Sequence, residues 1–534
     1  MEFDLLNYRY PSKRMVVFGN KGMVATSQQL AANAGLDIIK KGGNAIDGAI
    51  ATAACLTVVE PTSNGIGGDA FALVWYKDKL HGLDSCGYAP EGLSMEKLKE
   101  KGVEEIPKYG WIPVTVPGAP AAWRELSNKF GRLPLKDVLK PAIEYAMEGF
   151  PVSPTVAYFW ERAFSIYKNS LKGDEFKYWF STFTKNGRPP RVGEIWRLPH
   201  HGETLMEIGD TDGESFYSGD LAEKIDQFSR KTGGYIRKKD LENYKPEWVE
   251  PISVNYRGYD IWEIPPSGQG IVALMALNIL KEFEPADKED PITYHRQIEA
   301  IKLAFADAKE YLCDKKGMKV KVEDLLSDSY GKERKKLIED RAILPTFGKP
   351  NSGGTVYLAT ADGEGNMVSY IQSNYMGFGS GLVVPETGIA LHNRGHNFSN
   401  DPCHVNCLKP LKKPYHTIIP SFITKGKEAV GPFGVMGAFM QPQGHVQVAM
   451  NMIDFGLNPQ EALDVHRWQW IEGKKVLVEP NFPNNIARKL DHMGHEIHPQ
   501  LRSDTFGRGQ IIIKKNNTLL GASDPRADST VAVW

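Results

Sequence analysis

The sequence has little cysteine, no long hydrophobic run and almost no net charge. Its five cysteines are few for 534 residues and odd in number, which argues against a disulfide framework and fits a reducing compartment. No segment approaches the roughly 18 uncharged apolar residues of a membrane-spanning helix, and the first residues, MEFDLLNYRYPSKRM, lack the apolar run of a secretory signal. These features predict a cytoplasmic protein.

An excess of charge of either sign is also missing. Lysine and arginine total 64 against 65 for aspartate and glutamate, so the formal net charge is -1. A protein that binds nucleic acid through its phosphates needs a positive field, which this composition does not supply. A small-molecule or peptide substrate is therefore predicted, with neither nucleic acid nor a membrane as a partner.

The pattern of the N-terminal half indicates a mixed α and β protein. Ser27 is a candidate cap for a helix with apolar residues at helical spacing over 30–38, and Asn44 with Asp47 three residues later predicts a capped second helix. A β-type run follows over 70–76, whereas residues 156–244 have little strand character and are predicted to be helical. The chain is long enough for these elements to bury a large core.

A β-hairpin is predicted directly after Gly353-Gly354. The runs TVYLATA and MVSYIQS are joined by the Gly-rich loop Asp362–Asn366. If Ala361 pairs with Met367 across this loop, the register places Thr355 opposite Ser373, and opposed side chains share one face of a sheet. A second hydroxyl is therefore expected beside that of Thr355.

Thr355 has the surroundings that an autoprocessed nucleophile needs. Two glycines before a threonine permit backbone conformations that present the Gly354 carbonyl to the Thr355 hydroxyl for an N-to-O acyl shift. Hydrolysis of that ester would leave Thr355 as an N-terminus whose own α-amine acts as the base. The alternative is an ordinary β-branched strand residue after a flexible turn, and the tripeptide alone favours that alternative.

Several segments, in order along nearly the whole chain, favour the autoprocessed nucleophile over the ordinary strand residue. The sequence resembles the γ-glutamyltranspeptidase family in GGNAIDGAIATAACLTVVEPTSNGIGGDAF (42–71), VPGAPAAW (116–123), FGRLPLKDVLKPAIEYAMEGFPV (130–152), IPPSGQG (264–270), GGTVYLATADGEGNMVSYIQS (353–373), GFGSGLVVPETGIALHNRGHNFS (377–399) and GASDPRADS (521–529). Within the family, HNRGHNF and KPYHTIIP look like a divergent, transpeptidase-like branch.

The resemblance implies a four-layer αββα sandwich of the N-terminal-nucleophile hydrolase type, without a cofactor. It implies cleavage between Gly354 and Thr355 into a large segment, 1–354, and a small segment, 355–534, which remain together as a heterodimer and can form a higher oligomer. Ser373 falls at the position of the hydroxyl that hydrogen-bonds the nucleophile, in agreement with the hairpin register. The backbone N–H groups of Met440 and Gln441 fall at the oxyanion hole, where the family usually has two glycines.

The family's recognition of a γ-glutamyl group has changed in this sequence. Typical members bind the α-carboxylate with an arginine and the α-ammonium with acidic or amide side chains. The aligned positions that form the expected acyl pocket are Cys86, Tyr375, Arg394, Asn397, His416 and Thr417. Because the acid is replaced by Asn397, the pocket is expected to be cationic and to favour glutaryl-like acyl groups over γ-glutamyl ones.

The sequence disfavours two other kinds of site. SNGIGGD (63–69) lacks the Gly-Lys-Ser/Thr ending of a phosphate-binding loop and favours a turn packed near the active site. The histidines of LHNRGHNF lie four residues apart with glycine between them, which disfavours a zinc site on a helix. No metal is therefore predicted.

The sequence thus predicts an amidohydrolase or acyltransferase that hydrolyses or transfers γ-glutamyl or glutaryl-like groups through a Thr355 acyl-enzyme, with water or an amine as acceptor. The alternative is a non-catalytic binding or scaffold relative. Such a relative would explain the altered pocket, but it has no reason to keep Gly354, Thr355 and Ser373 in register.

Overall fold

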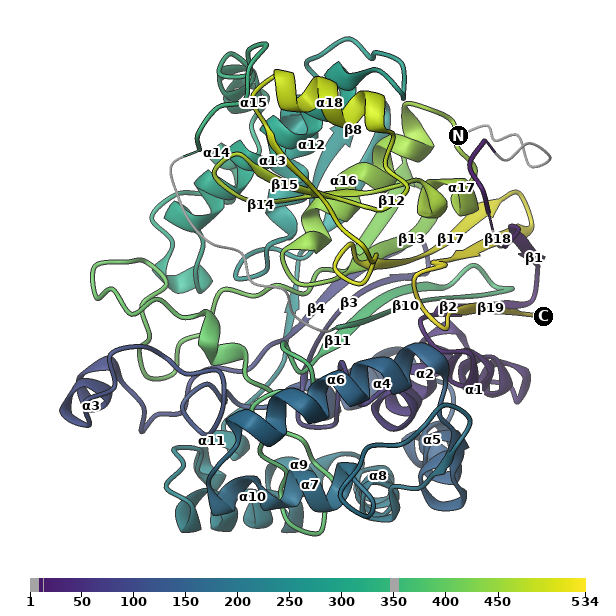
Figure 1. The fold of residues 1–534 in the computed structure, drawn as a ribbon. Coiled ribbons are helices and arrows are strands. Elements are labelled where there is room, and N and C mark those ends of the chain that lie inside the picture. Colours follow the sequence, from purple (N-terminus) through teal and green to yellow (C-terminus); the bar gives the residue numbers. More distant parts are fainter. Residues whose placement is uncertain (1–8, 13, 346–354) are drawn as a thin grey trace.

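Two seven-stranded sheets lie face to face in the middle of the molecule (Figure 1). The structure is a computed structural model that describes residues 9–12, 14–345 and 355–534. The first sheet has the order β19 (Thr530–Val533), β2 (Gly22–Thr26), β10 (Val356–Asp362), β11 (Met367–Ser373), β3 (Asp69–Tyr76), β4 (Lys79–Ser85) and β7 (Glu247–Val249). The second has the order β1 (Val17–Gly19), β18 (Thr518–Ser523), β17 (Arg508–Lys515), β13 (Glu428–Met436), β12 (Ser421–Lys425), β9 (Tyr259–Glu263) and β8 (Ile252–Tyr256).

Helices cover the outer face of each sheet, which confirms the predicted αββα order (Figure 1). The layer beside the first sheet contains α1 (Gln29–Lys40), α2 (Ala45–Val59), α4 (Ala119–Phe130), α5 (Leu135–Glu148), α6 (Pro154–Ser170), α7 (Lys177–Phe183), α8 (Pro199–Asp210), α9 (Glu214–Tyr217), α10 (Asp220–Lys231) and α11 (Lys238–Glu242). The layer beside the second contains α12 (Gly270–Leu280), α13 (Pro291–Tyr311), α14 (Val322–Leu325), α15 (Asp328–Lys335), α16 (Met440–Ile453), α17 (Pro459–Asp464) and α18 (Asn484–His492), with a small sheet of β14 (Trp468–Glu472), β15 (Lys475–Val478) and β16 (Glu496–Pro499). A short pair of strands, β5 (Phe150–Pro151) and β6 (Ile195–Trp196), packs with the helices of the first layer, and α3 (Met95–Glu100) lies apart from both layers (Figure 1).

The central strands of the first sheet, β2, β10, β11 and β3, are buried on both faces. In β10, Tyr357 and Ala359 belong to the core between the sheets, whereas Val356 and Leu358 belong to the core shared with the helices. This division follows from the alternation of side chains along a strand. It explains why the strand reads as an almost continuous apolar run, and it determines which residues of β10 and its neighbours face the space between the sheets.

The structure confirms the two predicted N-terminal helices, α1 and α2, but the N-cap residue of α1 differs from the predicted one. The side chain of Asn44 accepts from the backbone N–H groups of Ile46 and Asp47, and Asp47 accepts from the N–H of Asn44, so the capping box of α2 is present. Helix α1, in contrast, is capped by Gln28, one residue after the predicted Ser27. The Ser27 hydroxyl instead donates to Glu60 at 2.6 Å.

The two segments predicted to result from cleavage are interleaved in the fold. In the first sheet, β10, β11 and β19 come from 355–534 and the other four strands from the earlier part of the chain. Either segment alone would leave strand edges without partners, so the pieces are expected to stay associated. The cleavage site itself is not tested, because Gly354 lies outside the described residues.

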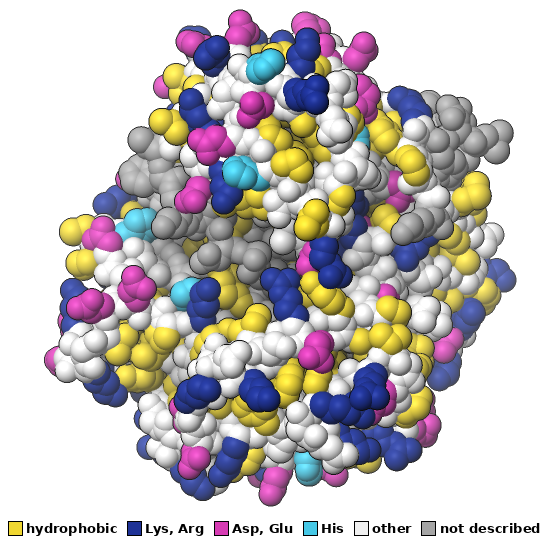
Figure 2. Space-filling model, in the orientation of Figure 1, with side chains coloured by type: hydrophobic (Ala, Val, Ile, Leu, Met, Phe, Trp, Pro, Cys, Tyr) yellow, Lys and Arg dark blue, Asp and Glu magenta, His cyan; other side chains and the backbone are white. Residues whose placement is uncertain are grey.

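The surface and helix lengths agree with the composition. The face drawn in Figure 2 carries positive and negative side chains interspersed, with no field of one sign. Among the described residues, no helix combines the length and the apolarity that crossing a bilayer would require.

Candidate active site

The β10–β11 hairpin has the predicted register. Ala361 pairs with Met367 and Val356 pairs with Gln372, so Thr355 lies opposite Ser373. Their hydroxyl oxygens are 3.1 Å apart, and the Ser373 oxygen also accepts from the backbone N–H of Tyr375 at 2.7 Å. Both side chains are buried. Ser373 is therefore held in place by its own turn and can orient the Thr355 hydroxyl.

A row of polar side chains continues from Thr355 across the first sheet. On β3, Asp69 pairs directly with Ser373. The next strand pairs Ala70 with Ser85, which brings Cys86 beside Asp69. Because opposed residues share a face, the row points into the space between the two sheets. The Thr355 hydroxyl at one end is thus aligned with a carboxylate and a thiol along one line of the sheet.

Asp69 is the centre of a buried charge network. Its carboxylate accepts from Arg394 through Nε at 2.9 Å and Nη2 at 3.1 Å, and from His416 Nε2 at 2.7 Å. His392 Nδ1 lies 3.3 Å away, and all four side chains are fully buried. Burial alone would raise the pKa of Asp69, but Arg394 and His416 hold it well below its usual range.

His416 is neutral at physiological pH in this network. Burial, with the Arg394 guanidinium nearby, lowers the pKa of its imidazole to about 4. Nδ1 accepts from the backbone N–H of Ile418 at 3.3 Å, so Nε2 carries the proton that is donated to Asp69. The charges of Asp69 and Arg394 therefore balance each other. The sequence predicted a cationic site, and the structure corrects that prediction.

The structure brings together all six predicted acyl-pocket residues. Arg394 donates through Nη1 to Thr417 at 2.6 Å and lies over the ring of Tyr375, 4.6 Å from its centroid. Tyr375 donates to Asn397 at 2.5 Å. Cys86 and His416 adjoin Asp69, with donor atoms within 4.8 Å of one another. Their place in the fold agrees with an acyl pocket, although their roles remain predictions.

Asp69 was missed because its motif was interpreted only as a turn. The sequence contained a usable signal: Asp69 heads the predicted strand after GIGG, and a carboxylate at a buried strand needs a cationic partner. Pairing that strand with β11, whose register was already known at Ser373, would have placed it in the row.

The predicted oxyanion residues lie at the start of α16. The N–H groups of Met440 and Gln441 donate to the carbonyls of Gly437 at 3.0 Å and Ala438 at 3.1 Å. A helix N-terminus favours negative charge, but an oxyanion here would have to share these N–H groups with the turn. Gln269 Nε2 joins Ala438 to Thr417 by donating to both carbonyls, so this turn is attached to the acyl pocket.

Among the residues that the structure describes, two clusters have donor atoms that a metal could use. The first is Asp69, Cys86 and His416, and the second is His295, Glu299 and His495. In each, a cationic side chain already occupies the carboxylate: Arg394 on Asp69, and Lys302 on Glu299 at 2.6 Å. Burial further keeps the Cys86 thiol protonated by raising its pKa well above the usual range. These residues fit a resident metal ion poorly.

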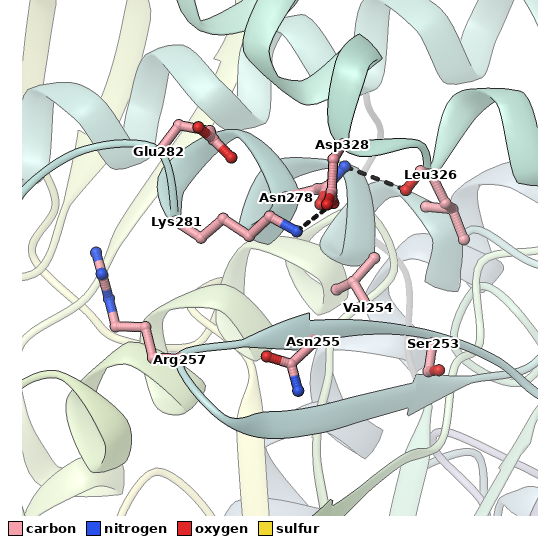
Figure 3. Close-up of a pocket in the computed structure, with 9 residues that line it drawn as sticks. All are labelled: Ser253, Val254, Asn255, Arg257, Asn278, Lys281, Glu282, Leu326 and Asp328. Carbon is pink, nitrogen blue, oxygen red and sulfur yellow. Dashed lines mark hydrogen bonds and ion pairs between the residues drawn. The ribbon is translucent and has the colours of Figure 1, made fainter.

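A cavity of about 550 Å³ lies away from this row, between the β8–β9 hairpin and helices α12 and α15 (Figure 3). Figure 3 shows Lys281 pointing to Asp328, and their charged atoms are 2.6 Å apart. Arg257, at its edge, pairs with Asp454 at 2.7 Å. Its cations are already paired and no predicted catalytic residue lines it, so it is not the active site.

Comparison with known proteins agrees with this geometry. Residues 31–534 match the family model described as gamma-glutamyltranspeptidase. The chain belongs to the γ-glutamyltranspeptidase family. It is similar to the glutathione hydrolase-like YwrD proenzyme of Bacillus subtilis strain 168, with 35% identity over 96% of this chain and 98% of the relative. The oxamate amidohydrolase proenzyme of Klebsiella pneumoniae is 32% identical over 96% of this chain and 98% of its own length.

A solved structure carries the comparison further. The crystal structure of cephalosporin acylase from Bacillus halodurans matches with a TM-score of 0.96 and 60% identity over 100% of this chain and 99% of that chain. This γ-glutamyltranspeptidase family member is therefore an N-terminal-nucleophile amidohydrolase that transfers acyl groups. Nothing in these relationships favours the non-catalytic alternative.

Replacing Ser373 by alanine is expected to lower kcat by about 10- to 100-fold with little change in KM, because the Thr355 hydroxyl loses the group that orients it. Steady-state kinetics measure this split, and denaturing mass spectrometry measures the rate of chain cleavage. The matched control is Ser369→Ala on the same face of β11, where the hydroxyl contacts Tyr357 at 2.8 Å. Equal losses in the two variants would contradict the orienting role.

Proposed function

We propose that Thr355 forms an acyl-enzyme with amide substrates, and that the preferred acyl group carries a carboxylate and no α-ammonium. The observation that carries the first part is the 3.1 Å contact of Thr355 and Ser373 at the end of the polar row. The second part is supported by Asp69, whose carboxylate is already occupied by Arg394 and His416.

The chemistry follows from a free N-terminus at Thr355. The hydroxyl oxygen attacks the amide carbonyl while its proton passes to the Thr355 α-amine. The developing oxyanion is stabilised by the N–H groups of Met440 and Gln441. The α-amine then gives the proton to the leaving nitrogen as the C–N bond breaks. Water hydrolyses the Thr355 ester, which releases the acid and restores the hydroxyl; an amine in place of water gives transfer.

The acyl preference rests on which partners remain in the pocket. An α-ammonium needs an acceptor with negative charge, but the Asp69 carboxylate already receives two bonds from Arg394 and one from His416. Glu386 offers no replacement, because it lies in an exposed turn. A carboxylate can use the guanidinium N–H groups that Asp69 and Thr417 leave over, since Arg394 has five donors.

The names of the relatives give one argument for an amine-free acyl group and one for a γ-glutamyl group. Oxamate, in the name of one relative, is an amide whose acyl group carries a carboxylate and no α-amine. Other relatives are named glutathione hydrolase, among them one from Bacillus subtilis strain 168 at 30% identity, which would favour γ-glutamyl donors. The bonds that Asp69 already accepts from Arg394 and His416 support the amine-free acyl group.

Glutaryl p-nitroanilide is expected to exceed γ-glutamyl p-nitroanilide in kcat/KM by at least about tenfold, the equivalent of ~1.4 kcal/mol. Both are measured on purified protein under identical conditions, with valeryl p-nitroanilide as the uncharged control. In Arg394→Lys, which keeps the charge beside Asp69 but loses the guanidinium fork, the glutaryl rate should fall and the valeryl rate should change little. A γ-glutamyl preference in the wild type would overturn the acyl assignment.

We further propose that the active protein is the associated pair 1–354 and 355–534 in a reducing, cytoplasmic compartment. The interleaved strands support the association. The five cysteines are all free, and four of them are buried, which agrees with a reducing compartment.

A further inference from the structure

A second cleft lies beside the turn that follows Ser373. Its volume is about 260 Å³. None of the six acyl-pocket residues lines it, although its wall includes Ser63, Met376 and Gly437. Ser63 accepts through its carbonyl from the N–H of Asn374, the residue after Ser373, and Gly437 accepts from Met440. The cleft therefore borders both the Ser373 turn and the predicted oxyanion turn.

Two adjacent residues, Tyr375 and Met376, contribute to the acyl pocket and to this cleft respectively. Tyr375 contacts Arg394 and Asn397 in the acyl pocket, whereas Met376 lines the cleft. Tyr375 has a φ of 72°, a left-handed conformation that is strained for a residue with a side chain. The strained turn sends the two neighbouring side chains into different spaces. An amide bound at Thr355 has its acyl part on one side of the carbonyl, so the other side is left for the amine.

The wall of the cleft combines apolar side chains with positive charge. Phe159 and Ile166 of α6 contribute apolar surface, and Ile166 is 43% exposed although it is a large aliphatic residue. The Arg508 guanidinium lies over the Phe159 ring, 4.3 Å from its centroid. A concave wall that combines apolar side chains with a few charged groups is typical of a ligand-binding cleft.

Positive charge exceeds negative charge around the cleft. The lining side chains include Lys108, Arg162 and Arg508 against one acid, Asp504. Arg162 is 3.4 Å from Asp504, whereas Lys108 is exposed and forms no ion pair with another described residue. Behind Arg508 lies Glu60 at 3.4 Å, and burial raises the pKa of its carboxyl to about 7. At neutral pH the Glu60 carboxyl is only partly ionised, so it neutralises the charge of Arg508 only in part.

We propose that this cleft binds the leaving amine of the substrate and selects amines that have an apolar body and a carboxylate. The proposal deepens the proposed function, because it assigns the second half of the amide that Thr355 cleaves. The apolar body would contact Phe159 and Ile166, and the carboxylate would lie near Lys108 and Arg162.

The test compares two leaving amines on one acyl group. Glutaryl-4-aminobenzoate and glutaryl-4-aminobenzamide have the same acyl part and similar rings, and only the first leaves as an anion. The wild type is expected to favour the aminobenzoate in kcat/KM by about three- to tenfold at low salt. Lys108→Ala with Arg162→Ala should bring this ratio to about one, whereas Lys427→Ala, on an exposed turn outside the cleft, should leave it unchanged.

The result that overturns the assignment is a wild-type ratio at or below one, or a preference that survives the double variant. The same two amines on a γ-glutamyl group separate this failure from failure of the acyl assignment, because the amine ratio does not depend on which acyl group is accepted. If no amide is cleaved at all, the proposed function fails. Calorimetric binding of free 4-aminobenzoate against 4-aminobenzamide then still supports or overturns the cleft.

Discussion

Replacing Thr355 by alanine is expected to give a single uncleaved chain with kcat lowered at least about 10³-fold. Alanine removes the oxygen that we propose attacks both the Gly354 carbonyl during processing and the substrate carbonyl during turnover. It leaves the strand in place, since Val356 begins the paired part of β10. Denaturing mass spectrometry measures cleavage, and release of p-nitroaniline measures turnover.

Thr355→Ser is the matched control, because it keeps the hydroxyl and loses only a methyl group. It should still cleave and turn over, at reduced rates. A Thr355→Ala protein that retains activity, or a cleaved Thr355→Ala chain beginning at residue 355, would contradict the role of this hydroxyl. Loss of activity in both variants with unchanged folding would point to the methyl group and not to the nucleophile.

Replacing Asp69 by asparagine is expected to lower the free energy of unfolding by ~3–5 kcal/mol, because it leaves the Arg394 guanidinium buried without its counter-charge. Both side chains are fully buried, so solvent cannot compensate. Asparagine has nearly the same size, so packing contributes little. Urea unfolding of the wild type and variant measures the difference.

The double variant Asp69→Asn with Arg394→Gln separates charge from shape. It should lose less stability than the sum of the two single variants, since it leaves neither charge unpaired. Asp504→Asn is the surface control: Arg162, its partner, has a half-exposed side chain, and this variant should change stability by less than ~1 kcal/mol. Additive effects at Asp69 and Arg394 would contradict a coupled pair.

The pH dependence of this contribution has a definite sign. The pKa of Asp69 is depressed in the folded protein, so its ionised form is favoured by folding. The contribution is fully present above the usual aspartate pKa of about 3.9 and is lost as the pH falls through the folded value, which lies well below it. Asp69→Asn should therefore differ most from the wild type near neutral pH and least in strong acid.

Local patterns in the sequence were sufficient to predict the contact of Thr355 with Ser373 but not the rest of the site. The loop Asp362–Asn366 determines the pairing of two adjacent strands, so the contact of Thr355 with Ser373 could be predicted from a few residues. The capping box at Asn44 could be predicted for the same reason. The layered fold came from resemblance over the whole chain, because local patterns cannot establish how sheets stack.

The charge of the acyl pocket could not be predicted from aligned positions alone. Asp69 is 304 residues from Ser373, and only the pairing of β3 with β11 brings them together. Comparing each position separately indicated that the family's acid had been lost at Asn397. The structure supplies an acid from another strand, and that acid neutralises Arg394 from inside the protein. The proposed discrimination against an α-ammonium now rests on a different reason, namely that Asp69 already accepts from Arg394 and His416.

The most direct measurement of the central claim is to locate the acyl group on the enzyme. Protein turning over glutaryl p-nitroanilide is quenched rapidly in acid, digested and mapped by mass spectrometry. The expected result is a peptide that begins at Thr355 with a free α-amine and carries the glutaryl group as an ester on its side chain. An active enzyme with an intact chain through Gly354 and Thr355, or a glutaryl ester on another residue, would contradict it.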